Sequence, residues 1–181
     1  MNTPVPILQH DAELAWIVDL YRRLQPRSVL EIGVWHGGTL FHWLTQARRD
    51  VSVVVVGVDP VIVDERLFRS WAPDNVELRF VVGRSGDPVT VRSVTSLLPR
   101  YDWVFIDGDH HYDAVNADWL AYNSLKQTVV FHDVFSQVNH DQQVPLFWND
   151  LKAAGWKTEE FSSDAGAAAG WGGIGVVYPG R

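Results

Sequence analysis

Two stretches of the sequence hold the side chains best suited to chemistry. Asp107 and His110 follow one apolar run, and His132 and Asp133 follow the next one along the chain. Apolar runs of this length, bounded by polar residues, are typical of buried strands. Carboxylates and imidazoles at one place can bind a divalent cation that holds a hydroxyl substrate, and they can remove the proton of that hydroxyl. These residue types therefore favour an enzyme site that acts on a hydroxyl group.

The elements that must position these side chains follow from the apolar periodicity. Strand-like and helix-like segments alternate, which predicts an α/β fold with a mainly parallel sheet and helices on both faces. We expect one domain over residues 1–181, in which residues 1–27 form an N-terminal helix and cover. The expected strands cover residues 28–33, 52–58, 76–82, 102–106, 129–132, 156–161 and 173–178, and the expected helices cover 11–24, 38–47, 65–71, 87–98, 112–125 and a segment ending near Ala154.

The connection between the last two expected strands differs from the others. Residues 162–172 are rich in glycine and alanine, which indicates a mobile segment with no room for a helix. The last two strands are therefore expected to pair antiparallel at one edge of the sheet. The other strands are expected to run parallel, so their carboxyl ends, and the chemical side chains that follow them, should meet at one edge.

A second group of strand-end residues is typical of a site for a nucleotide-type cofactor. The first strand leads into Glu31 and Gly33, Gly37 opens the next helix, and the second strand ends at Asp59. Glycines let the backbone pass close to a ligand, and an acid after the second strand can accept hydrogen bonds from ribose hydroxyls. Trp35 occupies the central glycine position of the dinucleotide fingerprint, where a bulky side chain is hard to reconcile with a pyrophosphate. The motif therefore favours a cofactor without phosphate at this turn.

Together these residues resemble the Rossmann-like, class I S-adenosylmethionine-dependent methyltransferases. The Ile-Asp-Gly-Asp-His run at Asp107 and the Phe-His-Asp run at Asp133 narrow the resemblance. They look like the small-molecule O-methyltransferases grouped with cephalosporin-hydroxylase-like and macrolide-sugar O-methyltransferases. The resemblance extends from about Val29 to Tyr178 and implies a seven-stranded methyltransferase sheet, mostly parallel with an antiparallel last strand.

The resemblance also implies roles for individual residues. Glu31 would help to place the methionine end of S-adenosylmethionine, Asp59 would bind its ribose, and Ser85 would lie near its adenine. In sugar O-methyltransferases of this type, the acid at the position of Asp107 binds magnesium and the histidine at the position of His110 is the general base. Asp133 would be the further catalytic acid. The other residues expected at the cofactor are Gly33, Trp35, His36, Gly37 and Asp107.

The expected metal ligands depart from the family pattern. The fifth strand of the family usually ends in two acids, whereas here His132 precedes Asp133. Mg²⁺ prefers oxygen ligands, so a set of Asp107, Asp133 and His132 would suit Mn²⁺, iron or zinc better than Mg²⁺. Without a metal, His132 would be a second base or a hydrogen-bond partner. The competitors of His110 for the role of base are His111, His132 and His140.

A structural role for the same residues stays open at this point. Asp109 or Asp113 could cap the following helix while His110 only holds the loop. Capping and catalysis are compatible, because one turn can do both.

The composition excludes several classes of protein. A net charge of −7 without any cluster of Lys and Arg argues against a nucleic-acid partner. The absence of cysteine excludes a disulfide framework and a thiolate nucleophile. The apolar runs are too short to span a membrane, and the N-terminus lacks the features of a signal peptide. A cytoplasmic enzyme is therefore expected.

The leading functional hypothesis is methyl transfer from S-adenosylmethionine to a small-molecule hydroxyl, as in a sugar or secondary metabolite. The alternatives are a non-catalytic cofactor-binding or interaction domain, a nicotinamide-dependent oxidoreductase, and a related fold with different chemistry. Trp35, Trp148 and Trp171 lie beside loops and could line a pocket. If Trp148 and Trp171 are exposed, they would favour a homo-oligomer.

Overall fold

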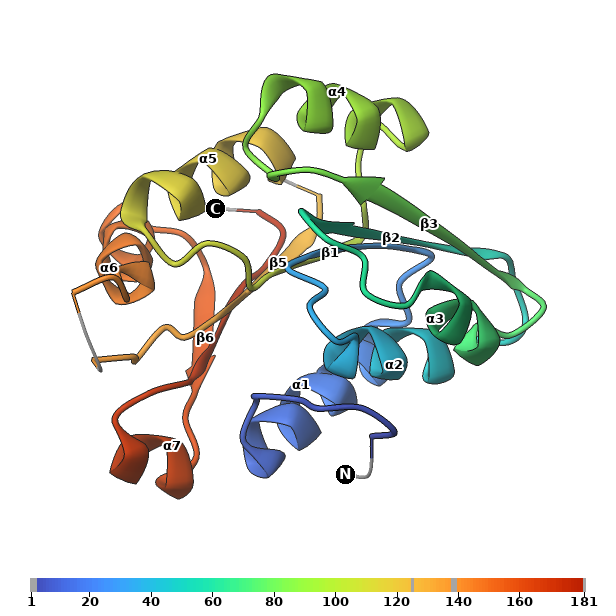
Figure 1. The fold of residues 1–181 in the computed structure, drawn as a ribbon. Helices are drawn as coiled ribbons and strands as arrows, with labels where there is room; N and C mark the ends of the chain where they lie inside the picture. Colours follow the sequence, from blue (N-terminus) through green and yellow to red (C-terminus); the bar gives the residue numbers. More distant parts are fainter. Residues whose placement is uncertain (1–2, 125, 138–139, 181) are drawn as a thin grey trace.

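The computed structural model describes residues 3–124, 126–137 and 140–180, which form a seven-stranded sheet (Figure 1). Its strands are β1 (Ser28–Ile32), β2 (Val53–Asp59), β3 (Val76–Val82), β4 (Trp103–Ile106), β5 (Thr128–His132), β6 (Thr158–Phe161) and β7 (Ile174–Val177). Their order across the sheet is β3-β2-β1-β4-β5-β7-β6. Strands β1 to β5 run parallel, whereas β7 is antiparallel to both β5 and β6. The predicted α/β fold, with its antiparallel last strand, is confirmed.

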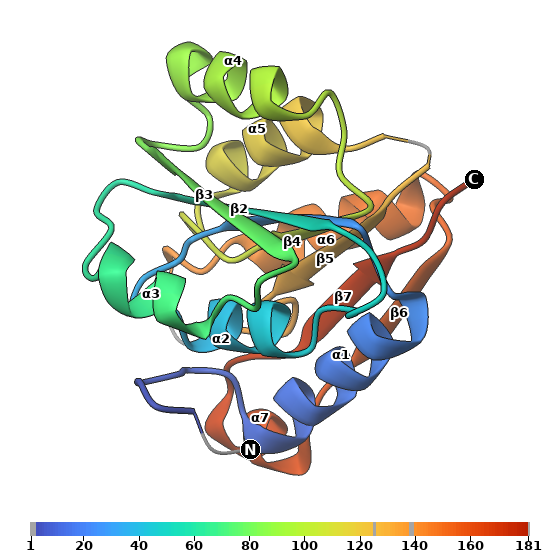
Figure 2. The ribbon, with the colours of Figure 1, turned by 90° about the vertical axis from the view of Figure 1, so that its right-hand side faces the viewer.

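Helices cover both faces of the sheet, as predicted. They are α1 (Asp11–Leu24), α2 (Gly38–Thr45), α3 (Glu65–Trp71), α4 (Pro88–Leu97), α5 (Tyr112–Tyr122), α6 (Val144–Ala153) and α7 (Asp164–Ala169). Figure 2 shows α1, α2 and α3 on one face, with α4 and α5 on the other. Leu125, which we expected at the end of α5, lies outside the described residues.

Alternate side chains of each central strand supply the two halves of the core. In β1, Val29 packs into the cluster beneath α1 and α2, and the next residue, Leu30, packs into the cluster beneath α5 and α6. This alternation follows from the period of two along a strand. Both side chains are fully buried, so β1 is covered on both faces and is fixed in the middle of the sheet.

Helix α7 corrects the expectation of a helix-free connection between the last two strands. Ser163 caps it by accepting a hydrogen bond from the Gly166 N–H at 2.9 Å, and Gly170 ends it in a left-handed conformation. The alanines between these two residues are strong helix formers. The capping serine and the terminal glycine therefore delimit one short helix, which lies beside the start of α1 (Figure 2).

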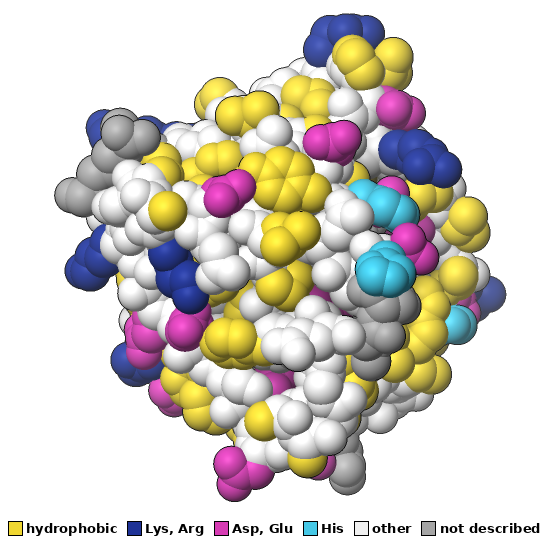
Figure 3. All heavy atoms as spheres, turned by 90° about the vertical axis from the view of Figure 1, so that its left-hand side faces the viewer, with side chains coloured by type: hydrophobic (Ala, Val, Ile, Leu, Met, Phe, Trp, Pro, Cys, Tyr) yellow, Lys and Arg dark blue, Asp and Glu magenta, His cyan; other side chains and the backbone are white. Residues whose placement is uncertain are grey.

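Two of the tryptophans do not form the expected exposed surface. Trp148 is buried within the core and donates a hydrogen bond from Nε1 to Glu160 at 2.7 Å. Trp171 is half-buried and lies against the ring of His10. In Figure 3, which shows the face bearing α6 and α7, the Lys and Arg side chains are scattered and do not gather in a patch. No helix in the described part of the chain is long and apolar enough to cross a membrane.

Candidate active site

A cavity of about 580 Å³ opens at the carboxyl ends of β1, β2 and β4. The strand order reverses in direction between β1 and β4, and ligands of parallel α/β sheets bind at such a position. The cavity is lined by an N-terminal segment (residues 6–9), the β1–α2 turn, the ends of β2 and β3 and the β4–α5 turn. The N-terminal segment lies directly over α2, because a Cβ added at Gly38 would come within 2.7 Å of Ile7.

The β1–α2 turn packs against the end of β4 so closely that one position excludes a side chain. Gly33 has a φ of +87°, and a Cβ added there would collide with the carbonyl oxygen of Asp107. The Gly33 N–H donates to Val58 O at 2.9 Å, which joins the turn to β2 as well. Gly33 thus fixes the distance between the expected cofactor turn and the expected catalytic acid.

We expect Gly33→Ala to lower the free energy of unfolding by about 3 kcal/mol, because it adds a backbone collision to an unfavourable φ. Gly155→Ala is the matched control. Gly155 has a φ of +79°, but no described heavy atom lies within 4 Å of its added Cβ, so only backbone strain of about 1 kcal/mol is expected. Urea unfolding of both variants measures the difference. Equal losses in the two would contradict the close packing of the turn.

Two backbone N–H groups orient the carboxylate of Asp59 at the cavity wall. Its Oδ2 accepts a hydrogen bond from the Trp35 N–H at 2.9 Å, and its Oδ1 accepts one from the Val61 N–H at 2.9 Å. Trp35 has a φ of +47°, which is uncommon for a residue other than glycine and places its backbone N–H toward Asp59. The carboxylate is therefore oriented before any ligand binds.

Only some of the other residues expected at the cofactor line the cavity. Trp35 and Ser85 line the cavity, whereas His36 and Gly37 do not. Glu31 lies beneath the cavity with no exposed surface, and it accepts a hydrogen bond from the hydroxyl of Thr39. Burial raises the pKa of Glu31 well above its usual range. Glu31 therefore supports Thr39, a cavity residue that our reading of the sequence missed.

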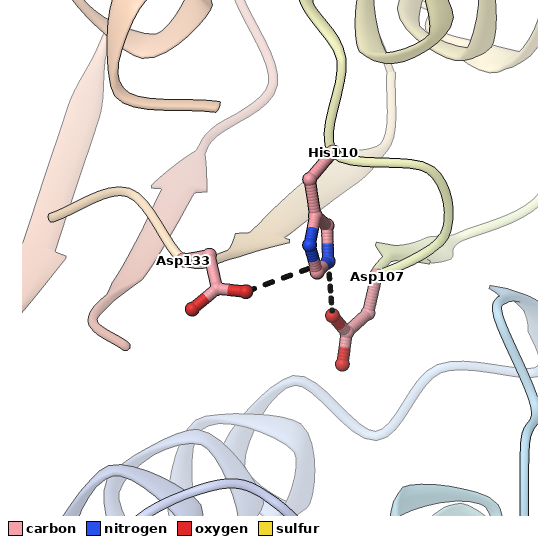
Figure 4. Close-up of side chains that lie close together, drawn as sticks. All are labelled: Asp107, His110 and Asp133. Atoms are coloured by element: carbon pink, nitrogen blue, oxygen red, sulfur yellow. Dashed lines mark ion pairs between the residues drawn. The ribbon is translucent and has the colours of Figure 1, made fainter. Parts of the chain in front are cut away.

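Two acids and two imidazoles meet beside this cavity, which Asp107 and His110 line; Figure 4 shows three of the four, Asp107, His110 and Asp133. His110 Nε2 lies 3.5 Å from Asp107 Oδ1 and 3.4 Å from Asp133 Oδ2. His132 Nδ1 lies 3.2 Å from the same Asp107 oxygen and 3.4 Å from the same Asp133 oxygen. The two strand ends thus converge, and each imidazole bridges both carboxylates. We refer to Asp107, His110, His132 and Asp133 as the four-residue cluster.

The charges within the four-residue cluster stabilise one another. Burial would raise the pKa of Asp107, but the neighbouring imidazoles, His132 first, outweigh this and hold it well below its usual range. Burial likewise lowers the pKa of His132, yet Asp107 and Asp133 outweigh it and raise the value to about 10. The Asp107 carboxylate raises the pKa of His110. His132 is therefore a buried cation at neutral pH, and His110 is the more exposed of the two imidazoles.

Asp133 is oriented by a turn that comes from the far end of the chain. Its φ is +63°, and its Oδ1 accepts hydrogen bonds from the Ser136 hydroxyl at 2.5 Å and from the Gly172 N–H at 3.1 Å. The adjacent Gly173 N–H donates to the buried carboxylate of Glu13 at 3.0 Å. These contacts leave Asp133 Oδ2 facing the two imidazoles.

Gln9 is a further residue of the site that our reading of the sequence missed. Its Nε2 donates to Asp107 Oδ2 at 2.7 Å, and Gln9 lines the cavity. The bond spans 98 residues of sequence, and no motif signals it. Gln9 therefore links the N-terminal segment directly to the expected catalytic acid.

Of the histidines that could compete with His110 for the role of base, His132 lies in the four-residue cluster, whereas His111 and His140 lie outside it. His111 is paired with Asp109, with a distance of 2.5 Å between His111 Nδ1 and Asp109 Oδ1, and its side chain is 57% exposed. His140 is exposed. In α5, the N-cap residue is His111, whose own side chain makes no capping hydrogen bond, and the Tyr112 N–H donates instead to Gln143 Oε1 at 2.9 Å. Asp109 and Asp113 therefore do not act as N-caps, although Asp109 accepts a hydrogen bond from the His111 N–H.

The fold and the acidic strand ends define a Rossmann-like enzyme with a site for a nucleotide-type cofactor. A family model described as a methyltransferase domain matches residues 30–134, which is more than half of the chain. The chain belongs to this methyltransferase family. The predicted resemblance to class I methyltransferases is confirmed. No curated protein matches the sequence.

Solved structures share the fold at low sequence identity. The O-methyltransferase TomG from Streptomyces achromogenes, in complex with SAM, is 16% identical with a TM-score of 0.62, and the match covers 96% of this chain and 82% of that one. Cofactor-bound Rv0187 from MTB is 18% identical with a TM-score of 0.69, covering 98% and 85%. MycE from the mycinamycin biosynthetic pathway, in complex with Mg, SAH and mycinamycin VI, is 18% identical with a TM-score of 0.61, covering 92% and 49%.

Proposed function

We propose that the protein transfers a methyl group from S-adenosylmethionine to a hydroxyl group of a small molecule. The observation that carries this proposal is the four-residue cluster, of which Asp107 and His110 line the cavity that also contains Asp59 and the Gly33 turn. Family membership supports methyl transfer, and the acids supply a means of removing a proton. We also propose that residues 1–181 act as one domain in which residues 1–27 form the helix and cover.

S-adenosylmethionine would lie along the cavity with its ribose at Asp59. Both Asp59 oxygens already accept backbone hydrogen bonds, so the carboxylate would need little reorganisation to bind the two ribose hydroxyls. Ser85 lines the cavity after β3, where the adenine would lie. The methionine end would then reach Thr39 and Asp107, which brings the sulfonium methyl group toward His110. His36 and Gly37 would shape the turn without touching the cofactor.

In the proposed reaction, the protein must align the acceptor oxygen with the methyl group and must supply a base that removes the hydroxyl proton. The acceptor oxygen attacks the methyl carbon, the O–CH₃ bond forms, and the S–CH₃ bond breaks to leave S-adenosylhomocysteine. The hydroxyl proton passes to the His110 imidazole, and the Asp107 and Asp133 carboxylates, which face its Nε2, stabilise the imidazolium that results. Asp107 raises the pKa of His110, which makes it a stronger base.

The ligand atoms of Asp107, His110 and Asp133 lie within 4.8 Å of one another, so this set fits a divalent cation. We propose that such a cation would be Mn²⁺ in preference to Mg²⁺, because imidazole is among its ligands. With His110 among its ligands, such a cation would lower the pKa of the acceptor hydroxyl itself, and His110 would then be a ligand and not the base. His132 lies beside the same two carboxylates and would hold their orientation from the buried side.

The acceptor that we propose is a sugar or another secondary metabolite, and the setting is the cytoplasm. TomG is involved in tomaymycin synthesis and MycE was solved with mycinamycin VI, which makes this class the first to test. Nucleic acid and membrane are not proposed as partners. A homo-oligomer would have to use apolar side chains other than Trp148, such as the exposed Leu120 of α5 and Leu146 of α6.

Calorimetric titration tests the cofactor directly. We expect S-adenosylmethionine to bind in the micromolar range and NAD to give no heat. Asp59→Ala should weaken binding about a hundredfold, because it removes two hydrogen bonds to a charged group. Asp74→Ala, which alters an exposed acid in the turn before β3, is the control and should bind normally.

The same titration is repeated with Mn²⁺ and with Mg²⁺ in place of the cofactor. Heat from Mn²⁺ that disappears in Asp133→Asn supports the metal site, and no binding of either ion contradicts it. If S-adenosylmethionine does not bind under any of these conditions, the methyltransferase proposal fails.

A further inference from the structure

Glu13 of α1 is a buried carboxylate to which the proposed reaction assigns no role. It has no exposed surface, and a glutamate is rarely buried so fully unless hydrogen-bond donors surround it. Its Oε1 accepts hydrogen bonds from the Ser163 N–H and the Ser163 hydroxyl, both at 3.0 Å, and its Oε2 accepts one from the Gly173 N–H at 3.0 Å. Glu13 therefore joins the start of α1 to both ends of the connection between β6 and β7.

The turn formed by Gly172 and Gly173 makes hydrogen bonds in two directions. The Gly173 N–H donates to Glu13, whereas the Gly172 N–H donates to Asp133 Oδ1 at 3.1 Å and to the Ser136 hydroxyl oxygen at 2.9 Å. The turn thus lies between α1 and the loop that follows β5. It links the Glu13 carboxylate to the Asp133 carboxylate through the backbone of Gly172.

This turn is packed tightly on both sides. A Cβ added at Gly172 would lie 2.9 Å from Glu13 Oε2, and one added at Gly173 would collide with the ring of Phe135. The Gly172 carbonyl oxygen also accepts a hydrogen bond from the Phe135 N–H at 3.0 Å. A change in the shape or hydrogen bonding of Glu13 should therefore displace the turn.

The orientation of Asp133 depends on this support, because its backbone is strained. Its φ of +63° is uncommon for a residue other than glycine, and such a conformation persists only where surrounding contacts hold it. Oδ1 accepts the hydrogen bonds from Ser136 and Gly172, and Oδ2 lies 3.4 Å from His110 Nε2. The direction of the carboxylate toward His110 is therefore set partly by the position of the Gly172 N–H.

We propose that Glu13 is a positioning residue of the transfer reaction, which directs the Asp133 carboxylate through the Gly172–Gly173 turn. This inference rests on the proposed function, because it takes Asp133 as a catalytic group. Glu13 does not line the cavity, so it acts on the reaction only through Asp133. A small displacement of a group that stabilises developing charge lowers the rate by a large factor. Binding of the cofactor, which does not involve Asp133, should be preserved.

The test measures kcat of Glu13→Gln with an acceptor identified by screening sugars, macrolides and phenols, together with calorimetric titration of S-adenosylhomocysteine. The glutamine keeps one acceptor oxygen, which should stay with the two donors of Ser163. The amide nitrogen then faces the Gly173 N–H, donor against donor. We expect kcat to fall about tenfold, and the dissociation constant of S-adenosylhomocysteine to change by less than about twofold.

A double-mutant cycle with Asp133→Asn separates positioning from a general effect on the fold. If Glu13 acts through Asp133, adding Glu13→Gln to Asp133→Asn should lower kcat by less than about twofold further. A loss of about tenfold in both backgrounds overturns the inference, and so does an unchanged kcat in Glu13→Gln alone. Both of these outcomes leave the proposed function intact.

Ser163→Ala is the matched control for stability. It removes the cap of α7 and one hydrogen bond to Glu13 Oε1, but it keeps the bond between Glu13 Oε2 and Gly173. It should lower the midpoint of urea unfolding while kcat stays within about twofold of the wild-type value. An equal fall of kcat in Ser163→Ala and Glu13→Gln would assign the loss to stability and overturn the inference.

Should Glu13→Gln fail to fold, Glu13→Asp decides by the same cycle. Aspartate keeps the charge but is one methylene group shorter, so it cannot reach both Ser163 and Gly173. If the wild-type protein neither binds S-adenosylhomocysteine nor transfers a methyl group, the proposed function and this inference fail together.

Discussion

Asp107→Asn should lower the rate of methyl transfer about a thousandfold at saturating S-adenosylmethionine. Among the described residues of the site, Asp107 alone contacts both imidazoles and the N-terminal segment. Its Oδ1 faces His110 and His132, and its Oδ2 accepts the hydrogen bond from Gln9. An amide lacks the charge that stabilises an imidazolium, and its nitrogen would face donors instead of accepting from them. Alignment and basicity are therefore lost together.

The pH dependence of the residual activity gives a second readout of the same substitution. A base works only when unprotonated, so the rate falls as the pH drops through its pKa. Asp107 raises the pKa of His110, and its removal must lower that pKa. The acidic limb of the pH–rate profile should therefore move to lower pH in Asp107→Asn. A merely structural role for Asp107 would reduce the rate without moving this limb.

The measurement follows release of S-adenosylhomocysteine in a coupled assay, after a screen of sugars, macrolides and phenols has identified an acceptor. The dissociation constant of S-adenosylhomocysteine should change by less than about tenfold, because Asp59 still holds the ribose. Asp113→Asn is the control and should keep the wild-type rate. If Asp107→Asn retained more than about a tenth of the rate, the cluster would not be the catalytic centre.

The convergence of Asp107 and Asp133 could be predicted because it depends only on strand direction. Each residue directly follows an apolar strand, and neighbouring parallel strands end at the same edge of a sheet. The same reasoning places Asp59 at that edge, after β2. A pattern of apolar runs thus contains enough information to bring together residues that lie far apart in the sequence.

Contacts made by single side chains over long distances could not be predicted in this way. Gln9 reaches Asp107 across the cavity, and Glu13 binds the N–H of Gly173, because the path of the chain happens to bring them together. Neither residue belongs to a repeating pattern. Packing of the whole fold decides such positions.

The connection before β7 shows that amino-acid composition alone does not predict whether a segment is ordered. Glycine and alanine together suggested a mobile segment, yet the alanines form α7 and the glycines end it and shape the turn that follows. Gly172 and Gly173, both with positive φ, then direct their N–H groups to Asp133 and to Glu13. The glycines are thus needed for the geometry of the cluster and are not a sign of mobility.

The buried charge of His132 should make the stability of the protein fall as the pH rises above neutrality. Its pKa is about 10 in the folded protein, against about 6.5 in an unfolded chain. A group whose pKa is raised by folding stabilises the protein fully below the unfolded pKa, and this contribution is lost as the pH rises through the folded pKa. Between pH 6.5 and pH 10 the free energy of unfolding should therefore decrease by about 4 kcal/mol.

Urea unfolding of the cofactor-free protein in EDTA, at intervals across that range, measures this decrease. His132→Gln removes the titrating group and should give a smaller, nearly pH-independent free energy of unfolding. His140→Gln, at an exposed position, should reproduce the slope of the wild-type protein. If the wild-type stability is flat between pH 6.5 and pH 10, His132 is neutral when folded. The two carboxylates would then share a proton or a cation instead of facing an imidazolium, and Mn²⁺ would be the first candidate to test.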